Sequence, residues 1–259
     1  MISITSAQLD AWIAAFIFPL ARILGLLATA PMFNNAALPR RTRLIAGLAI
    51  AMALVPALPP LPTLSAGSWV GLAVLAQQII VGVIMGFALR IAFAAVDLTG
   101  ELVGLQMGLS FAVFFDPQST GQTPVISEFF GLLATLVFLA MNGHLLALSL
   151  LAESFTLLPV TIDPISAGGI GRLVTGAAMI YVLGLMISLP LVAALLIANI
   201  AMGFLSRVAP QLNLFAVGFP VTLLAGFAVI ALSLPYFGAA LDSVFNQGFE
   251  LMRAVMRAS

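Results

Sequence analysis

The sequence predicts an all-α integral membrane protein built from about six long apolar helices. Of the 259 residues, 63% are hydrophobic and only 7% are charged, and the mean hydropathy is +1.22. A soluble domain ordinarily carries about a quarter charged residues, so this chain has too few to cover a surface in water. Uncharged apolar runs of about 20 residues, the length that crosses a bilayer as a helix, recur along the chain.

The residue types exclude several functions. The net charge is zero, and the nine basic residues are arginines without the clustered basic face that binds nucleic acid. With no cysteine and one histidine, His144, we expect no metal, no cofactor and no catalytic residue. Ser149 lies at i+5 from His144 and faces elsewhere on a helix. The chain also has no lysine and no GxxxxGK[ST] motif to hold a nucleotide.

Residues 11–33 form the first apolar segment. It is expected to be retained rather than cleaved, because no basic region precedes it and Asp10 does. Arg22 lies near its centre, where a charge facing lipid is costly, so we expect Arg22 to face protein through a salt bridge or a carbonyl contact. The polar connector 34–43 follows with three arginines, which the positive-inside rule places in the cytoplasm.

The next two apolar runs differ in length. Residues 44–58 are barely long enough to span and end in a proline-rich stretch, whereas residues 70–89 form a full span that Arg90 closes. Arg90, Asp97 and Glu101 follow at i, i+7 and i+11, near one face of a helix. We favour a structural ion pair between neighbouring helices, with Asp97 and Glu101 as carboxylates of a proton relay as the alternative.

The stretch 100–124, GELVGLQMGLSFAVFFDPQSTGQTP, is built unlike its neighbours. Gly100, Gly104 and Gly108 recur every four residues and form a small-residue stripe that lets two membrane helices approach closely. Asp116-Pro117 is expected to end this helix, because proline disfavours the α conformation of the residue before it. The residues that follow read as a loop.

A second face of the same stretch is bulky and apolar. It can pack into a membrane core, which is the common role of such a stripe, or it can form a hydrophobic plug. The spacing permits the plug without proving it. The face consists of Met107, Phe111, Phe114 and Phe115.

The second half of the chain begins with an uncharged run over 129–152 that contains His144, a lone histidine more typical of a helix-to-helix hydrogen bond than of a base. Two uncharged runs of 34 residues then flank Arg207. They predict a helical hairpin whose turn includes Gln211 and Asn213. A 34-residue helix is about 51 Å long against a hydrocarbon core of about 30 Å, so each arm must kink at Pro190 or Pro220, tilt, or lie outside the bilayer.

Four separated motifs occur in order along the chain. They are LPRRTRLIAGLAIAMAL from Leu38, GELVGLQMGLSFAVFFDP from Gly100, LVFLAMNGHLLALSLLAESFTLLP from Leu136 and RVAPQLNLFAVGFP from Arg207. With these motifs the chain resembles the FliR family of export-gate subunits, whose injectisome counterparts are the SctT or Spa-type proteins. The similarity covers nearly the whole chain.

The resemblance implies a division of the chain. The N-terminal part is similar in arrangement to FliP and the C-terminal hairpin to FliQ, so that one chain resembles a fusion of the two. The implied parts are a FliP-like region over 1–155 with a plug loop at about 106–122, a connector over 156–172, a FliQ-like hairpin over 173–241 and an amphipathic tail over 242–259.

The resemblance also implies a function, a location and partners. A FliR-like subunit joins FliP-like and FliQ-like subunits in the conduit for unfolded flagellar proteins, in the inner membrane at the flagellar basal body, with FlhA-type and FlhB-type components. The loop at 106–122 would be the plug, sealed by its Met and Phe side chains. The loop with Arg207, Gln211 and Asn213 would face the cytoplasmic entrance, near the FlhB-type subunit.

Two other functions stay open from the sequence alone. An injectisome gate of virulence-type secretion shares the motifs. A secondary transporter of small solutes would suit the intramembrane charges Arg22, Asp97 and Glu101, but it predicts internal repeats with broken helices, and the sequence has no such repeat. An intramembrane enzyme would need a nucleophile with a base or a metal pair, and these groups are nearly absent.

Overall fold

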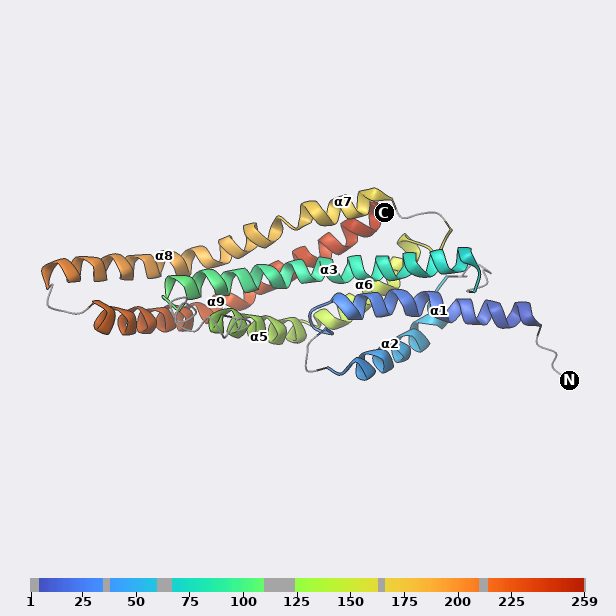
Figure 1. Ribbon diagram of the computed structural model, residues 1–259, viewed down its shortest axis with the longest axis horizontal. Coiled ribbons are helices and arrows are strands. Elements are labelled where there is room, and N and C mark those ends of the chain that lie inside the picture. The colour runs from blue at the N-terminus through green and yellow to red at the C-terminus, as the bar shows by residue number, and fades with distance from the viewer. Residues whose placement is uncertain are drawn as a thin grey trace. The chain divides into compact units, whose positions relative to one another are not determined.

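The computed structural model describes residues 5–34, 38–59, 67–109, 124–162, 166–209 and 214–258, and over these residues the chain is helical with no strand (Figure 1). The predicted all-α class is therefore confirmed for this part of the chain. The elements are α1 (Ser6–Thr29), α2 (Arg40–Leu54), the short 3-10 helix η1 (Val55–Ala57), α3 (Trp69–Gln106), α5 (Val125–Ala140), α6 (Gly143–Leu157), α7 (Ala167–Gly176), α8 (Met179–Val208) and α9 (Leu214–Ala258).

Fewer helices than expected are long and apolar enough to cross a membrane. Across the described ranges there are four such stretches, or five if the bent pair α5 and α6 counts as one span, against about six expected. α2 has 15 residues and falls short of the roughly 20 that a span needs. The four stretches are Gln8–Thr29, Trp69–Gln106, Gly168–Val208 and Gly218–Ala258.

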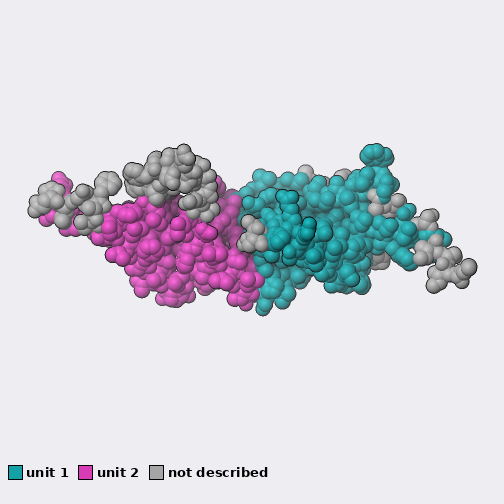
Figure 2. Space-filling view, turned by 60° about the horizontal axis from the view of Figure 1, so that its bottom comes forward, with its two compact units in different colours: residues 1–91, 142–177, 246–259 teal, residues 92–141, 178–245 magenta. Residues whose placement is uncertain are grey.

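The chain divides into two compact units, which Figure 2 shows in two colours. Unit 1 contains α1, α2, the first part of α3, α6, α7 and the end of α9. Unit 2 contains the rest of α3, α5, α8 and most of α9. The units are interleaved in the sequence, because α3 and α9 each contribute to both. Unit 1 comprises Met1–Ile91, Asn142–Ala177 and Asn246–Ser259, and unit 2 comprises Ala92–Met141 and Ala178–Phe245.

In unit 1, α1 and α3 touch backbone to backbone at glycines. A Cβ atom added at Gly25 would lie 2.6 Å from the carbonyl oxygen of Ile79, and one added at Gly82 would collide with the carbonyl oxygen of Arg22. Thr29 Oγ1 donates to the Gly25 carbonyl at 2.9 Å and lies 3.3 Å from that of Val83. This is how small residues allow close helix packing in membrane proteins, where lipid is as apolar as the side chains.

The C-terminus of α9 packs beside α7 within unit 1. Ser166 Oγ donates to the carbonyl of Ala258 at 2.6 Å, and Gly176 at the other end of α7 faces Leu251. Arg253 forms ion pairs with Glu250 at 2.7 Å and Glu153 of α6 at 4.0 Å. These contacts hold the last turns of α9, which the sequence predicts as a tail, in the unit.

Unit 2 has an aromatic core. The ring centroids of Phe93, Phe138 and Phe245 lie 5.0 to 5.6 Å apart, and the rings of Phe130 and Phe237 stack at 4.6 Å. Such pairs add stabilisation beyond the apolar area they bury. They join α3, α5 and α9.

α8 enters unit 2 through a small residue. A Cβ atom added at Gly184 would lie 2.9 Å from the carbonyl oxygen of Ala95, so the backbones of α8 and α3 are close there. The hydroxyl of Thr99, which is fully buried, donates to the Gly184 carbonyl at 3.1 Å. A hydroxyl buried among apolar helices needs such a partner.

The structure corrects two of the expected helix boundaries in the middle of the chain. α3 runs through Arg90, which the sequence places at the end of a span, because an exposed arginine is a good helix former. The expected span 129–152 is broken into α5 and α6, which meet at 67°. Asn142 at the break has φ 57°, a left-handed conformation that asparagine tolerates better than most residues.

α9 is longer than the arm predicted from the charge pattern. It has 45 residues and passes without interruption through position 242, where the sequence places the start of a separate tail. Both long helices also continue through their prolines, Pro190 in α8 and Pro220 and Pro235 in α9. The FliP-like and FliQ-like division remains a prediction.

Candidate functional site

The stretch expected to hold the plug begins where α3 crosses α5 in unit 2. Gly100 lies directly on the backbone of Ser127, and a Cβ atom added at Gly104 would lie 3.6 Å from Cβ of Ile126. Ser127 Oγ donates to the carbonyl of Asp97 at 2.8 Å. Two glycines of the predicted stripe therefore face a neighbouring helix.

The third glycine of that stripe ends the helix. Gly108 has φ 81°, a region that glycine enters without steric cost. The N–H of Leu109 donates to the carbonyl of Gly104 at 3.1 Å, and the N–H of Gly108 donates to that of Leu105 at 3.0 Å. These two bonds form a Schellman motif with Gly108 as its left-handed residue. The expected helix end at Asp116-Pro117 is wrong for α3, whose last residue is Gln106.

Met107, the first residue of the predicted plug face, lies inside unit 2. Its side chain is fully buried against Gly226 of α9, where a Cβ atom would lie 2.5 Å from the Met107 methyl carbon. Asn199 of α8 donates to the carbonyl of Gln106 at 3.2 Å, which satisfies one of the orphan carbonyls at the helix end. The end of α3 is thus held by two other helices of the same unit.

The three aromatic residues of the plug face lie outside the described residues. They are Phe111, Phe114 and Phe115. Met107 is the member of the face whose surroundings are known, and it packs as a core residue. The role of the three aromatic rings as a plug therefore stays a prediction. The structure shows only that α3 ends before them, at Gly108.

The charges of α3 lie on its exposed side. Arg90 belongs to unit 1, and Asp97 and Glu101 belong to unit 2; all three residues are exposed. One carboxylate oxygen of Asp97 lies beside Gly131 of α5, 3.3 Å from where its Cβ would be. The ion-pair interpretation and the relay alternative both stay predictions.

Arg22 is the largest fully buried side chain of the described residues, and its surroundings are all in unit 1. Nε donates to Gln78 Oε1 of α3 at 2.8 Å. One terminal nitrogen donates to the carbonyl and hydroxyl oxygens of Ser154 at 2.8 and 3.0 Å, and the other donates to the carbonyl of Leu158 at 2.8 Å. The guanidinium carbon lies 4.1 Å from the centre of the Phe155 ring.

This arrangement explains how a cation is accommodated in an apolar helix. Ser154 and Leu158 lie at the C-terminal end of α6, where the helix dipole is negative. The Ser154 carbonyl also accepts the N–H of Leu158 at 2.9 Å, whereas the Leu158 carbonyl lies beyond the last helical hydrogen bond. Charge-assisted hydrogen bonds to these oxygens, with the Phe155 face on one side, replace the water that Arg22 loses. The carbonyl contacts expected for Arg22 are present, and they join α1, α3 and α6.

The residues of the predicted cytoplasmic-side loop are only partly described. Arg207 lies in the last turn of α8 and is exposed. A cation there interacts favourably with the C-terminal end of the helix dipole. Gln211 and Asn213 lie outside the described residues.

His144 lies in the first turn of α6, just after the bend at Asn142. Its Nδ1 atom is buried and has no hydrogen-bond partner in the described part of the chain. The described residues also contain no group of three or more His, Cys, Asp or Glu side chains able to hold a metal ion.

Several residues that organise unit 1 were not predicted. Gln78 and Ser154 bind Arg22, and Gly82 and Gly86 admit α1 to the surface of α3. The sequence does contain a signal for the two glycines, because Gly82 and Gly86 form a GxxxG pattern, typical of close helix packing, in the apolar run 70–89. No pattern in the sequence pairs Arg22 with residues more than 50 positions away.

The chain is similar to known proteins over nearly its whole length. Residues 13–248 match the family described as "Bacterial export proteins, family 1". The flagellar biosynthetic protein FliR of Pectobacterium carotovorum subsp. carotovorum is 41% identical over 256 residues, covering 99% of this chain and 98% of that protein. The FliR protein of Escherichia coli K12 is 38% identical over the same shares, and that of Bacillus subtilis 168 is 27% identical over 93% of this chain and 94% of its own.

Proposed function

This chain belongs to family 1 of the bacterial export proteins, and from that membership we propose that it is a subunit of the flagellar protein export apparatus in the bacterial inner membrane. The observation that carries the proposal is the extent of the match. Identity of 41% runs over 99% of this chain and 98% of a FliR relative, so the similarity covers nearly the whole length of both chains. The apolar helices long enough to cross a membrane suit that location.

The finer proposal is a conduit shared with FliP-like and FliQ-like subunits. It is supported by the surface of α8, which exposes large apolar side chains along its whole length, among them Leu185, Leu189, Ile197 and Phe204. A helix that is apolar on its outer side must be covered by lipid or by other helices. At 45 residues α9 is about 68 Å long, more than twice the core of a bilayer, and lateral packing against other subunits would cover the part outside.

The gate itself is proposed to lie in the segment after Gly108. The Schellman motif ends α3 there, and Met107 anchors that end in unit 2 by packing on Gly226. Phe111, Phe114 and Phe115 would then close the conduit by an apolar constriction that excludes water and ions. In this proposal Met107 supports the plug from within the subunit, while the three rings seal it.

Opening would be passive. The plug would move when a substrate or another subunit engages the gate, and the energy would come from other components or from the proton-motive force. The exposed Arg207 at the end of α8 would face the cytoplasmic entrance and the FlhB-type subunit.

Deletion of the gene tests the proposal. The culture medium is assayed for hook and filament subunits, with plasmid-borne restoration as the control. We expect loss of secretion at normal intracellular subunit levels. Unchanged secretion and motility would reject the flagellar function, and the same assay on injectisome substrates would then test the gate of virulence-type secretion.

The plug has a separate test in the restored strain. Replacing Phe111, Phe114 and Phe115 together by glycine should make membranes leak small ions while the gate still assembles. The matched control replaces Phe87 and Phe129, exposed rings of α3 and α5, by glycine. An assembled triple variant with unchanged ion permeability would assign the three rings to core packing.

A further inference from the structure

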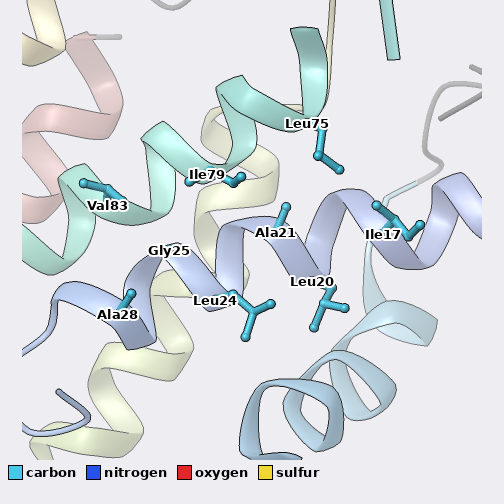
Figure 3. Close-up of a pocket in the computed structure, with 9 residues that line it drawn as sticks. All are labelled: Ile17, Leu20, Ala21, Leu24, Gly25, Ala28, Leu75, Ile79 and Val83. Atoms are coloured by element: carbon cyan, nitrogen blue, oxygen red, sulfur yellow. The ribbon is translucent and has the colours of Figure 1, made fainter. Parts of the chain in front are cut away.

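A narrow apolar groove runs between α1 and α3 in unit 1 (Figure 3). One wall is the face of α1 from Ile17 to Ala28, and the other is formed by Leu75, Ile79 and Val83 of α3. All its lining residues are apolar, so it offers no group to a hydrophilic ligand or an ordered water. It lies beside the contact of the two backbones at Gly25.

The dimensions of the groove select its occupant. It has a volume of about 370 Å³, and the twelve residues from Ile17 to Ala28 extend about 17 Å along α1. A long apolar groove between two helices suits a single hydrocarbon chain, which gains dispersion contacts with both walls. A helix, about 10 Å in diameter with its side chains, does not fit.

The length of the groove matches one leaflet of a membrane. Half of a hydrocarbon core of about 30 Å is about 15 Å, close to the extent of the groove. Ala28, at one end of the groove, is one residue from Thr29, where α1 ends. An acyl chain in the groove would therefore reach the membrane interface near the C-terminal end of α1.

A cluster of arginines lies at this same end. α2 runs back along α1, because its Gly47 packs on Leu24, a groove residue, while its Arg43 donates to Asn34 Oδ1 at 2.6 Å, beyond the end of α1. Arg40 and Arg41 are in the first turn of α2 and are exposed. The cluster is Arg40, Arg41 and Arg43.

The charges of this cluster call for an anion. The first turn of α2 contains no acidic residue, and the N-cap makes no side-chain hydrogen bond. Cations at the N-terminus of a helix are repelled by its dipole, whereas an anion there is stabilised. The start of α2, near the end of α1, thus carries positive charge that could bind a lipid phosphate.

We propose that the groove holds one acyl chain of an anionic phospholipid whose phosphate lies against Arg40 and Arg41. The lipid would fill the space that the glycine contact leaves between α1 and α3, and it would neutralise the start of α2. This site is independent of the flagellar function proposed above, since its test measures lipid and not secretion.

The experiment uses the full-length chain together with the subunits that copurify with it, extracted from membranes in a mild detergent. Native mass spectrometry counts the retained phospholipids, and the delipidated complex is then offered phosphatidylglycerol or phosphatidylcholine vesicles. We expect one tightly retained phosphatidylglycerol per copy of this chain, and weaker retention of phosphatidylcholine.

Two sets of variants locate the lipid. Ala28→Phe fills the groove and should lower retention about tenfold for every two methylenes that the ring displaces, while Ala53→Phe, at an exposed alanine of α2 outside the groove, should not. Arg40→Gln with Arg41→Gln should lower phosphatidylglycerol retention about fivefold per arginine. Arg172→Gln with Arg257→Gln, both exposed in unit 1, is the charge-matched control.

Gel filtration of each variant complex shows whether it still assembles, and Ala28→Leu replaces Ala28→Phe if the larger ring prevents assembly. Equal retention of phosphatidylglycerol in the Ala28 variant and the wild type would overturn the groove as the site. Equal retention of the two lipids, unaffected by the arginine changes, would overturn the headgroup assignment. A wild-type complex that retains no phospholipid would overturn the proposal as a whole.

Discussion

The interior of unit 1 and the surface of α8 in unit 2 differ in whether their side chains find partners within the chain. Around Arg22, four hydrogen bonds and one aromatic face enclose a cation in a region of apolar helices. Along α8, apolar side chains such as Ile197 and Phe204 are exposed, at 70% and 67% of their surface. Arg22 finds all these partners within the chain, whereas the exposed apolar side chains of α8 need lipid or other subunits to cover them.

The difference separates two kinds of defect. A change near Arg22 or at the α1–α3 contact should destabilise this chain by itself, because its partners are its own residues. A change on the outer face of α8 should leave the chain folded and weaken what it binds. The four predictions below begin with the largest expected loss of the chain's own stability.

Arg22→Leu should have the largest effect. It leaves the buried Gln78 and the partly buried Leu158 carbonyl without their donor, at about 1–3 kcal/mol for each such group, so we expect a loss of about 2–6 kcal/mol. Thermal aggregation of the purified protein in detergent, followed by gel filtration, measures it. Arg172→Leu, at an exposed arginine of α7, is the control, and an Arg22→Leu protein as stable as that control would contradict the role of the network.

Gly82→Ala should follow, with a loss of about 1–3 kcal/mol. The new methyl group would collide with the Arg22 carbonyl oxygen, a backbone atom that moves only if α1 and α3 separate. Gly203→Ala is the matched control, since a Cβ atom there meets open space, and it should raise stability by about 0.5–1 kcal/mol. The same aggregation assay compares the two, and equal behaviour would argue against the close contact.

Asn142→Ala should cost less, about 1–2 kcal/mol, because alanine is strained in the left-handed conformation. Asn142→Gly should retain the bend between α5 and α6 with little or no loss, since glycine adopts φ 57° freely. Hydrogen exchange at the backbone of Leu145 and Leu146, which both donate to the Asn142 carbonyl, reports the change locally. Faster exchange in the glycine variant than in the alanine variant would reverse this explanation.

Ile197→Asn should have the smallest effect on the chain itself, within about 0.5 kcal/mol for an exposed position, and a clear effect on copurification with its partner subunits. Leu195→Asn, two residues away but 1% exposed, should instead destabilise the chain itself. Affinity purification followed by quantification of the partners distinguishes them. Normal copurification of the Ile197 variant would remove this face of α8 from the interface.

The class of fold and several of its elements were predictable because they follow from local rules. Long apolar runs predicted α1, α3, α8 and α9. The high free-energy cost of a charge facing lipid predicted that Arg22 is buried in protein. The expected helix end at Asp116-Pro117 failed for a physical reason. A glycine in a repeating stripe reads as a packing residue, yet Gly108 adopts φ 81° and ends the helix through two hydrogen bonds.

What could not be predicted depends on contacts far apart in the sequence. Gln78 looks like a tolerated polar residue in an apolar run until Arg22 is placed beside it. In the sequence, Met107 is as bulky and apolar as the rings that follow it, so it cannot be told apart from them. Its packing on Gly226 of α9 identifies it as a core residue. The units are interleaved along the chain, and no pattern of period 3.6 reports such an arrangement.

The Arg22 network also sets an order of events during synthesis of the protein. Its hydrogen-bond partners lie 56, 132 and 136 residues further along the chain. At about 5–20 residues per second, Leu158 leaves the ribosome roughly 7 to 27 seconds after Arg22. During that interval the guanidinium must be kept hydrated, at the membrane surface or in the insertion machinery, so α1 can take its final depth only after α6 has arrived.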